Sequence, residues 1–210
     1  MRVRALLLAM ASLCAASSAA AQPRFEAAIG ITWTGGFDAG GSNALESGGS
    51  PGTPPLTLFN QRSRVEAAPG LSARATYFFS SHLGVEASAQ ASRPLLRTTI
   101  SGDFENATGS EAVSRLSSYV FGGSLLYRFG RGRLSPFAIG GGGRLRQLDD
   151  DNVTLVTASE LHLGGGLNYR LSRHVGVRGE AVASVRDRSL AFDGKRRTLP
   201  VIAASLAYRF

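Results

Sequence analysis

Three histidines are the side chains best suited to chemistry in this 210-residue chain, and their neighbours decide which chemistry is open to them. They are His82, His162 and His174. An imidazole can act as a general base when it lies beside a serine hydroxyl and a carboxylate holds it in place. Each histidine is instead followed by an apolar residue and then a glycine, and no segment gathers His, Asp and Ser. The sequence therefore indicates no catalytic residue, and we expect no enzyme.

Three short runs of like residues could bind a ligand. The acidic run 149–151 offers the carboxylate oxygens that a divalent cation prefers, although an acidic hairpin tip in solvent has the same composition. The basic run 195–197 could contact phosphate groups or form an exposed turn. The glycine run 140–143 lacks the Lys-Ser/Thr pair and the helix of a phosphate loop. We expect no metal site and no cofactor.

Most other charged side chains occupy alternate positions of short segments, and a period of two residues is typical of β-strands. After residue 22, helical periodicity is nearly absent, and Gly, Ser and β-branched residues are frequent. One face of each segment is apolar or glycine, whereas the other mixes small residues with charges. The predicted strands are 24–34, 71–79, 83–92, 119–129, 137–146, 160–171, 175–186 and 201–210.

The two faces of these strands predict what surrounds them. A soluble β-sandwich buries its apolar face, but here the apolar faces carry no charge, as lipid requires. The charged faces fit a narrow barrel lumen, where opposite charges pair and glycine makes room for them. We predict a structural charge network in this lumen, formed by Glu26, Arg74, Glu86, Arg128, Arg144, Glu160, His162, Arg170, Arg178, Glu180 and Arg209.

The N-terminal segment predicts export. Residues 1–21 combine a basic start, a short apolar run and a small-residue cleavage site, so we expect a cleaved secretory signal peptide. Cys14 lies inside it after Leu13, where a lipoprotein signal requires a small residue. The formal charge of +8 falls to +6 when the two signal arginines are removed. An exported chain without a clustered basic stripe is not expected to bind nucleic acid. No later segment has the roughly 18 consecutive apolar residues of a membrane helix, which leaves a closed barrel as the way to cross a membrane.

The even-numbered predicted strands share an aromatic ending on the lipid side. Tyrosine prefers a membrane interface because its ring is apolar and its hydroxyl is polar. The predicted interfacial girdle and assembly signal comprise Tyr77, Phe79, Tyr127, Phe129, Tyr169, Tyr208 and Phe210, with Leu171 at the equivalent place in one strand.

Short and long connections alternate along the predicted strands. Three short turns follow the aromatic endings, and two belong to a repeated hairpin, Tyr-x-Phe/Leu-Ser-x-His-x-Gly-Val. The other connections are longer or polar, at 35–69, 94–113, 147–153 and 187–197. The first is rich in Gly, Ser and Pro, and we expect a mobile outer loop there. Outer-membrane barrels have short periplasmic turns and long outer loops, so both termini are expected in the periplasm.

With these features, residues 22–210 resemble the small outer-membrane β-barrels of the OmpA/OmpX-like superfamily. The resemblance rests on the eight strands, the short-turn rim and the final Leu206-x-Tyr208-x-Phe210. It implies an all-β fold, an eight-stranded antiparallel up-and-down transmembrane β-barrel. It also implies that the barrel-assembly machinery recognises the terminal Phe during biogenesis. Since the sequence ends at Phe210, we expect the barrel domain only, without a peptidoglycan-binding domain.

Three functions remain open at this stage. The first is a non-enzymatic structural or surface-interaction role through the outer loops, in which adhesion or surface protection rests on the resemblance alone. The second is a narrow pore for ions or solutes, because glycine in the strands leaves room for a thin water path. The third is a lipid A-modifying enzyme, which the missing motif disfavours. The expected partners are outer-membrane lipids and lipopolysaccharide, around a monomer integral to the bacterial outer membrane.

Overall fold

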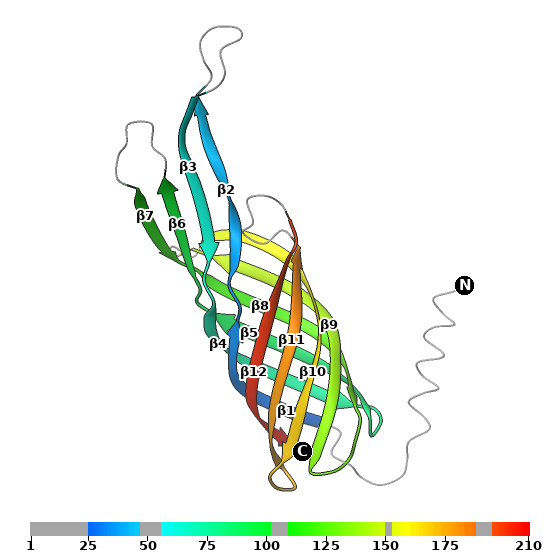
Figure 1. The fold of residues 1–210 in the computed structure, drawn as a ribbon. Helices are drawn as coiled ribbons and strands as arrows, with labels where there is room; N and C mark the ends of the chain where they lie inside the picture. Colours follow the sequence, from blue (N-terminus) through cyan, green and yellow to red (C-terminus); the bar gives the residue numbers. More distant parts are fainter. Residues whose placement is uncertain (1–24, 47–55, 102–108, 150–152, 188–194) are drawn as a thin grey trace, which may run out of the picture.

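The computed structural model describes residues 25–46, 56–101, 109–149, 153–187 and 195–210. Eight antiparallel strands form a closed barrel, in which each strand pairs with its neighbour and β1 completes the ring between β4 and β12 (Figure 1). The barrel strands are β1 (Phe25–Thr34), β4 (Ala68–Phe78), β5 (Leu83–Ser92), β8 (Ser117–Arg128), β9 (Leu134–Leu148), β10 (Thr154–Arg170), β11 (Val175–Asp187) and β12 (Arg197–Arg209). The predicted fold class and strand number are confirmed.

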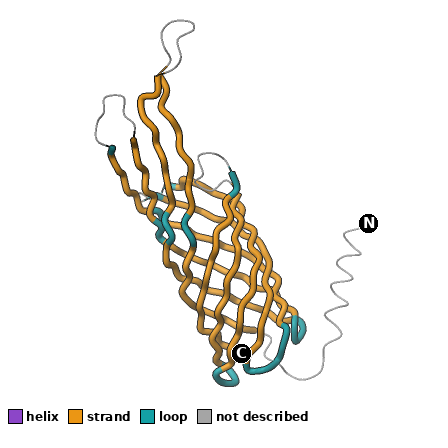
Figure 2. The backbone as a smooth tube through the Cα atoms, in the orientation of Figure 1, coloured by secondary structure: helices purple, strands orange, loops and turns teal. Residues whose placement is uncertain are grey.

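A second sheet stands on one rim of the barrel and is called the projecting sheet below (Figures 1 and 2). Its strands, in the order β2-β3-β6-β7, are β2 (Phe37–Glu46), β3 (Leu56–Val65), β6 (Leu95–Ser101) and β7 (Ser110–Arg115). They continue the barrel strands β1, β4, β5 and β8 beyond the rim. The chain bends from β1 into β2 at Gly35-Gly36, where a Cβ on Gly36 would come within 2.6 Å of the Val65 carbonyl oxygen.

The projecting sheet occupies segments that the sequence predicted as connections. Most of 35–69 lies in β2 and β3, so this stretch adds strand length, and most of 94–113 lies in β6 and β7. The base of this sheet packs on the barrel through Phe37, Ala39 and Val65, but a strand with both faces in water has no reason to alternate apolar and polar residues. Every residue of β7 is exposed, which explains why no period of two was visible there.

The turns that follow β4, β8 and β10 lie on the opposite rim, which is called the short-turn rim below and also holds the C-terminus (Figure 1). The repeated hairpin has a structural reason there. Ser80 and Ser172 each accept hydrogen bonds from the backbone N–H groups two and three residues on, which fixes the turn. The histidine that follows stacks on a tyrosine of the next strand: His82 on Tyr127 at 6.1 Å, and His174 on Tyr208 at 5.9 Å between ring centroids.

The predicted faces are correct for seven of the eight barrel strands and inverted in β9. Elsewhere apolar side chains point outward, such as Ile29 and Leu163, which are 69% and 71% exposed. In β9, Phe137, Ile139 and Leu145 are buried in the lumen, and Arg144 is exposed on the outer wall. The placement of Arg144 in the lumen network was therefore wrong.

The inversion in β9 is accommodated by glycine on the neighbouring strand β10. Phe137 pairs with Gly166 of β10, where a Cβ would come within 2.7 Å of the Phe137 ring. Glycine thus supplies the volume that a lumenal aromatic ring needs. Phe137, Ile139 and Leu145 share one face, as the alternation predicted, but that face lines an apolar part of the lumen rather than the outer wall.

Within the described ranges, no helix has the length and apolarity needed to cross a membrane. The signal peptide expected at 1–21, with Cys14, and residues 150–151 of the acidic run lie outside the described residues.

Candidate functional site

Four charged side chains meet across the middle of the lumen and are called the central quartet below: Arg74, Glu86, Arg178 and Glu180. Arg178 donates to both carboxylates, at 2.5 Å to Glu86 and 2.7 Å to Glu180. Arg74 contacts the same two carboxylates, and its Nη1 lies 3.3 Å from Glu86. Thr76 adds a hydroxyl donor to Glu86 at 2.8 Å.

The central quartet spans the barrel because of strand order. Glu86 lies on β5 and Arg178 on β11, which are four strands apart in the ring of eight and therefore opposite each other. Arg178 is 1% exposed and Glu86 is 3% exposed. Two arginines and two glutamates balance their charges, as burial in a low-dielectric interior demands. All four residues were predicted in the lumen network.

A second ion pair lies between the central quartet and the projecting sheet. Arg186 donates to Glu160 at 2.8 Å, and both side chains are buried. The predicted network omitted Arg186, although it lies on the same face of β11 as Arg178, at an even separation. His162 was predicted in the ion-pair network, and its Nε2 lies instead 2.7 Å from the hydroxyl of Ser124.

Apolar clusters close the lumen on both sides of these charges. Phe78, Leu126, Phe137 and Ile139 pack together, and the guanidinium groups of Arg128 and Arg178 lie over the rings of Phe78 and Phe137, at 4.2 Å and 4.4 Å. A second cluster fills the barrel end beneath the projecting sheet and consists of Phe37, Ala39, Val65, Leu116 and Leu199. The cavity between the central quartet and His162 is only about 40 Å³.

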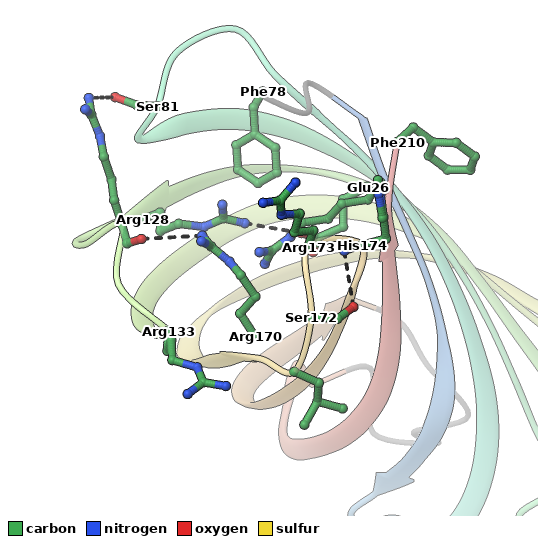
Figure 3. Close-up of a pocket in the computed structure, with 13 residues that line it drawn as sticks. Glu26, Phe78, Ser81, Arg128, Arg133, Arg170, Ser172, Arg173, His174 and Phe210 are labelled. Carbon is green, nitrogen blue, oxygen red and sulfur yellow. Dashed lines mark hydrogen bonds and ion pairs between the residues drawn. The ribbon is translucent and has the colours of Figure 1, made fainter. Parts of the chain in front are cut away.

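The short-turn rim opens into a much larger space, called the mouth cavity below, of about 820 Å³ (Figure 3). Glu26 lies on its wall and accepts hydrogen bonds from Arg209 at 2.6 Å and Arg128 at 3.4 Å. Arg170, predicted in the charge network, lines this cavity and donates to the carbonyl oxygen of Arg131 at 3.4 Å rather than to a carboxylate.

Three further arginines line the mouth cavity and were not predicted as site residues: Arg131, Arg133 and Arg173. They lie in the two turns that follow β8 and β10. The sequence did hold a sign of this cluster. Alternation predicted that both turns lie on the same rim, and the two turns together contain these three arginines.

The described part of the chain contains no group of three or more His, Cys, Asp or Glu side chains arranged to hold a metal ion. The predicted girdle residues do gather at the short-turn rim. Tyr77, Tyr127, Tyr169 and Tyr208 are each about half-exposed on the outer wall, as is expected of interfacial tyrosines.

A closed barrel with an apolar outer wall and a charged, filled lumen is the architecture of a small outer-membrane β-barrel protein. The chain matches the family model of the outer membrane protein beta-barrel domain over residues 5–210, and it belongs to that family. It is thus an integral protein of the bacterial outer membrane.

Solved structures of similar fold support this assignment. The outer membrane protein OprG from Pseudomonas aeruginosa shares 14% identity over 89% of this chain and 95% of its own, with a TM-score of 0.57. Neisserial surface protein A shares 12% identity over 89% of this chain and 97% of its own, with a TM-score of 0.56. At these identities the likeness concerns the fold alone. No curated protein matches the chain by sequence.

Proposed function

We propose that the protein is a closed, non-enzymatic, monomeric scaffold that presents the projecting sheet to the outside of the cell as a surface for interaction. The observation that carries this proposal is the central quartet, which fills the lumen with balanced charge from opposite walls. With no path through the barrel, the surfaces left to act are those beyond its rims.

The narrow-pore alternative needs a continuous water path. The cavity beside the central quartet, about 40 Å³, has room for only a few water molecules, since one needs about 10–15 Å³. Apolar clusters lie on either side of it. These features favour a sealed barrel over a channel.

Two serine–histidine contacts could serve an enzyme: Ser124–His162 in the lumen at 2.7 Å and Ser81–His82 in the turn after β4 at 2.8 Å. The space beside His162 has room for only a few water molecules, and among the described residues no carboxylate is hydrogen-bonded to either histidine. Both contacts therefore fit a structural hydrogen bond better than a nucleophile and its base.

The projecting sheet supplies an exposed surface of the kind that surface interactions need. Among the described strands, none pairs with the outer sides of its two outermost strands, β2 and β7. Such edges offer unpaired backbone groups to other molecules. Arg62, Arg64 and Arg115 are exposed on this sheet and add positive charge to it.

Planar-bilayer recordings on the purified protein test the sealed barrel. We expect no steady conductance above the lipid background. A sustained, reproducible channel would overturn the proposal in favour of the narrow pore.

Cysteine labelling tests which rim faces outward. The chain has a single cysteine, at position 14 within the predicted signal, so an introduced thiol is unique in the mature protein. Asn60→Cys on β3 should react with a membrane-impermeant maleimide on intact cells. Gly130→Cys, where a Cβ meets no heavy atom within 4 Å, should react only after the outer membrane is permeabilised. The reverse pattern would place the projecting sheet in the periplasm.

A further inference from the structure

The mouth cavity carries more positive charge than the carboxylates of the described residues neutralise. Its lining includes six arginines and one acidic side chain, Glu26. Three of the arginines lie on the barrel strands β8, β10 and β12, and three lie in the turns after β8 and β10. They are Arg128, Arg170 and Arg209 on the strands, and Arg131, Arg133 and Arg173 in the turns. Figure 3 shows Arg128, Arg170 and Arg173 directed into the same space.

Glu26 is already committed within the protein. It accepts from Arg209 and Arg128, so its carboxylate is shared by the two arginines nearest the lumen. Among the described residues, no carboxylate lies within ion-pair distance of Arg131, Arg133, Arg170 or Arg173. Within the described residues, the Arg131 guanidinium donates to the hydroxyl of Ser81 through one nitrogen, Nη2, which leaves most of its donors available.

The cavity has the size of a ligand site. Small-molecule sites measure roughly 300–1,000 Å³, and the mouth cavity is about 820 Å³. Guanidinium groups bind phosphate and carboxylate oxygens through two parallel hydrogen bonds, so several arginines around one space are suited to a multivalent anion.

We propose that the mouth cavity binds a small soluble oligophosphate. Six guanidinium groups against the carboxylates of Glu26 and of the C-terminal Phe210 leave about four positive charges. A phosphate monoester carries about 1.5 to 2 negative charges near neutral pH, so two to three phosphate groups match this excess. Carboxylates carry one charge each, and four of them would have to fit into the same space. The arginines line the mouth of the lumen, whereas lipid headgroups lie outside the girdle, so the phosphate comes from a solute rather than from a lipid.

Isothermal titration calorimetry with sodium tripolyphosphate tests this site, on the full protein in phosphatidylcholine nanodiscs. The test variant combines Arg131→Gln, Arg133→Gln and Arg173→Gln, all in turns and outside the ion pairs of the lumen. We expect the variant to bind tripolyphosphate more weakly than the wild type, by about tenfold or more for each arginine removed, because each substitution removes a charge-assisted hydrogen bond. Heat-modifiable migration on a gel verifies that the variant still folds.

A matched control removes the same charge from the other end of the molecule. It combines Arg62→Gln, Arg64→Gln and Arg115→Gln, all exposed on the projecting sheet. We expect this control to bind tripolyphosphate as the wild type does. Equal loss in both triple variants would mean that net charge alone attracts the anion, and unchanged binding in the mouth variant would mean that the site lies elsewhere. Either result overturns the proposal, and so does the absence of wild-type binding below millimolar concentrations.

The source of the phosphate is tested by the lipid. Replacing phosphatidylcholine with phosphatidylglycerol in the nanodisc should leave tripolyphosphate binding nearly unchanged. If anionic headgroups abolish it, the cavity takes lipid phosphate and the soluble ligand is wrong. The result is independent of the proposed function, because a barrel that conducts ions could still bind tripolyphosphate and a sealed one could fail to.

Discussion

The central quartet and the mouth cavity use the same side chains to opposite effect. The quartet sets two arginines against two glutamates, all with side chains less than 10% exposed. The mouth cavity sets six arginines against one glutamate in an open space. Only a layer of apolar side chains around Phe78 and Phe137 separates them.

The difference shows what separates a charged group that fills the lumen from one that can bind a ligand. In the first, positive and negative charges are equal in number, and in the second, positive charges are in excess. A buried ion must be paired and hydrogen-bonded, because desolvation costs several kcal/mol per ion. Charges at a solvated opening are not under that requirement and can keep their donors for an incoming ligand. The comparison predicts that the same kind of substitution should have large effects on stability in the quartet and small ones in the mouth cavity.

The largest expected effect comes from Glu86→Ala. It removes a carboxylate that both Arg178 and Arg74 contact, so buried positive charge is left uncompensated. We expect the free energy of unfolding to fall by about 3–5 kcal/mol. Urea unfolding in micelles, followed by the fluorescence of Trp33, the single tryptophan, measures it. The control Glu111→Ala removes an exposed partner of Arg97 in the projecting sheet and should cost about 1 kcal/mol or less.

Within the mouth cavity, Arg209→Ala and Arg173→Ala should separate a structural arginine from a free one. Arg209 is buried and holds Glu26 at 2.6 Å, so its loss should cost about 2 kcal/mol of unfolding free energy. Arg173 lies exposed in a turn, and its loss should stay within about 0.5 kcal/mol. Equal losses in the same urea titration would contradict the division of this cavity into paired and unpaired arginines.

The apolar layer can be tested with two glycines. Gly166→Ala would place a methyl group within 2.7 Å of the Phe137 ring and against the backbone of β11, so we expect a loss of about 1–3 kcal/mol. Gly179→Ala, on the outer wall, meets nothing within 4 Å and should leave stability unchanged or slightly raised. If both variants unfold at the wild-type urea concentration, the layer is less tightly packed than the structure shows.

The smallest expected effect concerns the ion pair between Asp38 and Arg62, which is exposed on the projecting sheet. Hydrogen bonds from Arg62 and from the backbone of Gly40 lower the pKa of the Asp38 carboxyl below the ordinary value. Because the folded pKa is lowered, the pair stabilises the sheet above the ordinary Asp pKa and loses this contribution as pH falls through the lowered value. NMR titration of the Asp38 carboxyl should show the shift, and Arg62→Gln should return the pKa toward the ordinary value. If the pKa of Asp38 is the same in Arg62→Gln as in the wild type, Arg62 is not the cause of the lowered value.

Alternation predicted the barrel because lipid and lumen impose opposite demands on successive residues. Glu86, Arg178 and Glu180 could be assigned to the lumen for that reason. Their grouping into one quartet could not be predicted, since it depends on which strands lie opposite each other in the closed ring.

The fold could not be predicted where the strand does not lie between lipid on one face and a charged lumen on the other. β9 faces an apolar part of the lumen, so Phe137 resembled a lipid-facing residue and Arg144 a lumenal one. The strands of the projecting sheet alternate between buried and exposed residues only at their base, at Phe37, Ala39 and Val65, and β7 is exposed along its whole length. A segment this short gives too few alternations to predict a strand. Gly40, whose φ is 91°, also interrupts β2 at an irregularity in its pairing with β3, which hides the strand further.

The bond between Glu26 and Arg209 has a consequence for the order of events when the barrel forms. The two residues are 183 positions apart and lie on β1 and β12, the pair that closes the ring. Bringing such distant segments together costs chain entropy before any contact compensates for it. Arg128, on β8, reaches the same carboxylate across the lumen, so Glu26 joins strands from three distant parts of the chain. We therefore expect this hydrogen-bonded group to be complete only after β12 has closed the ring on β1.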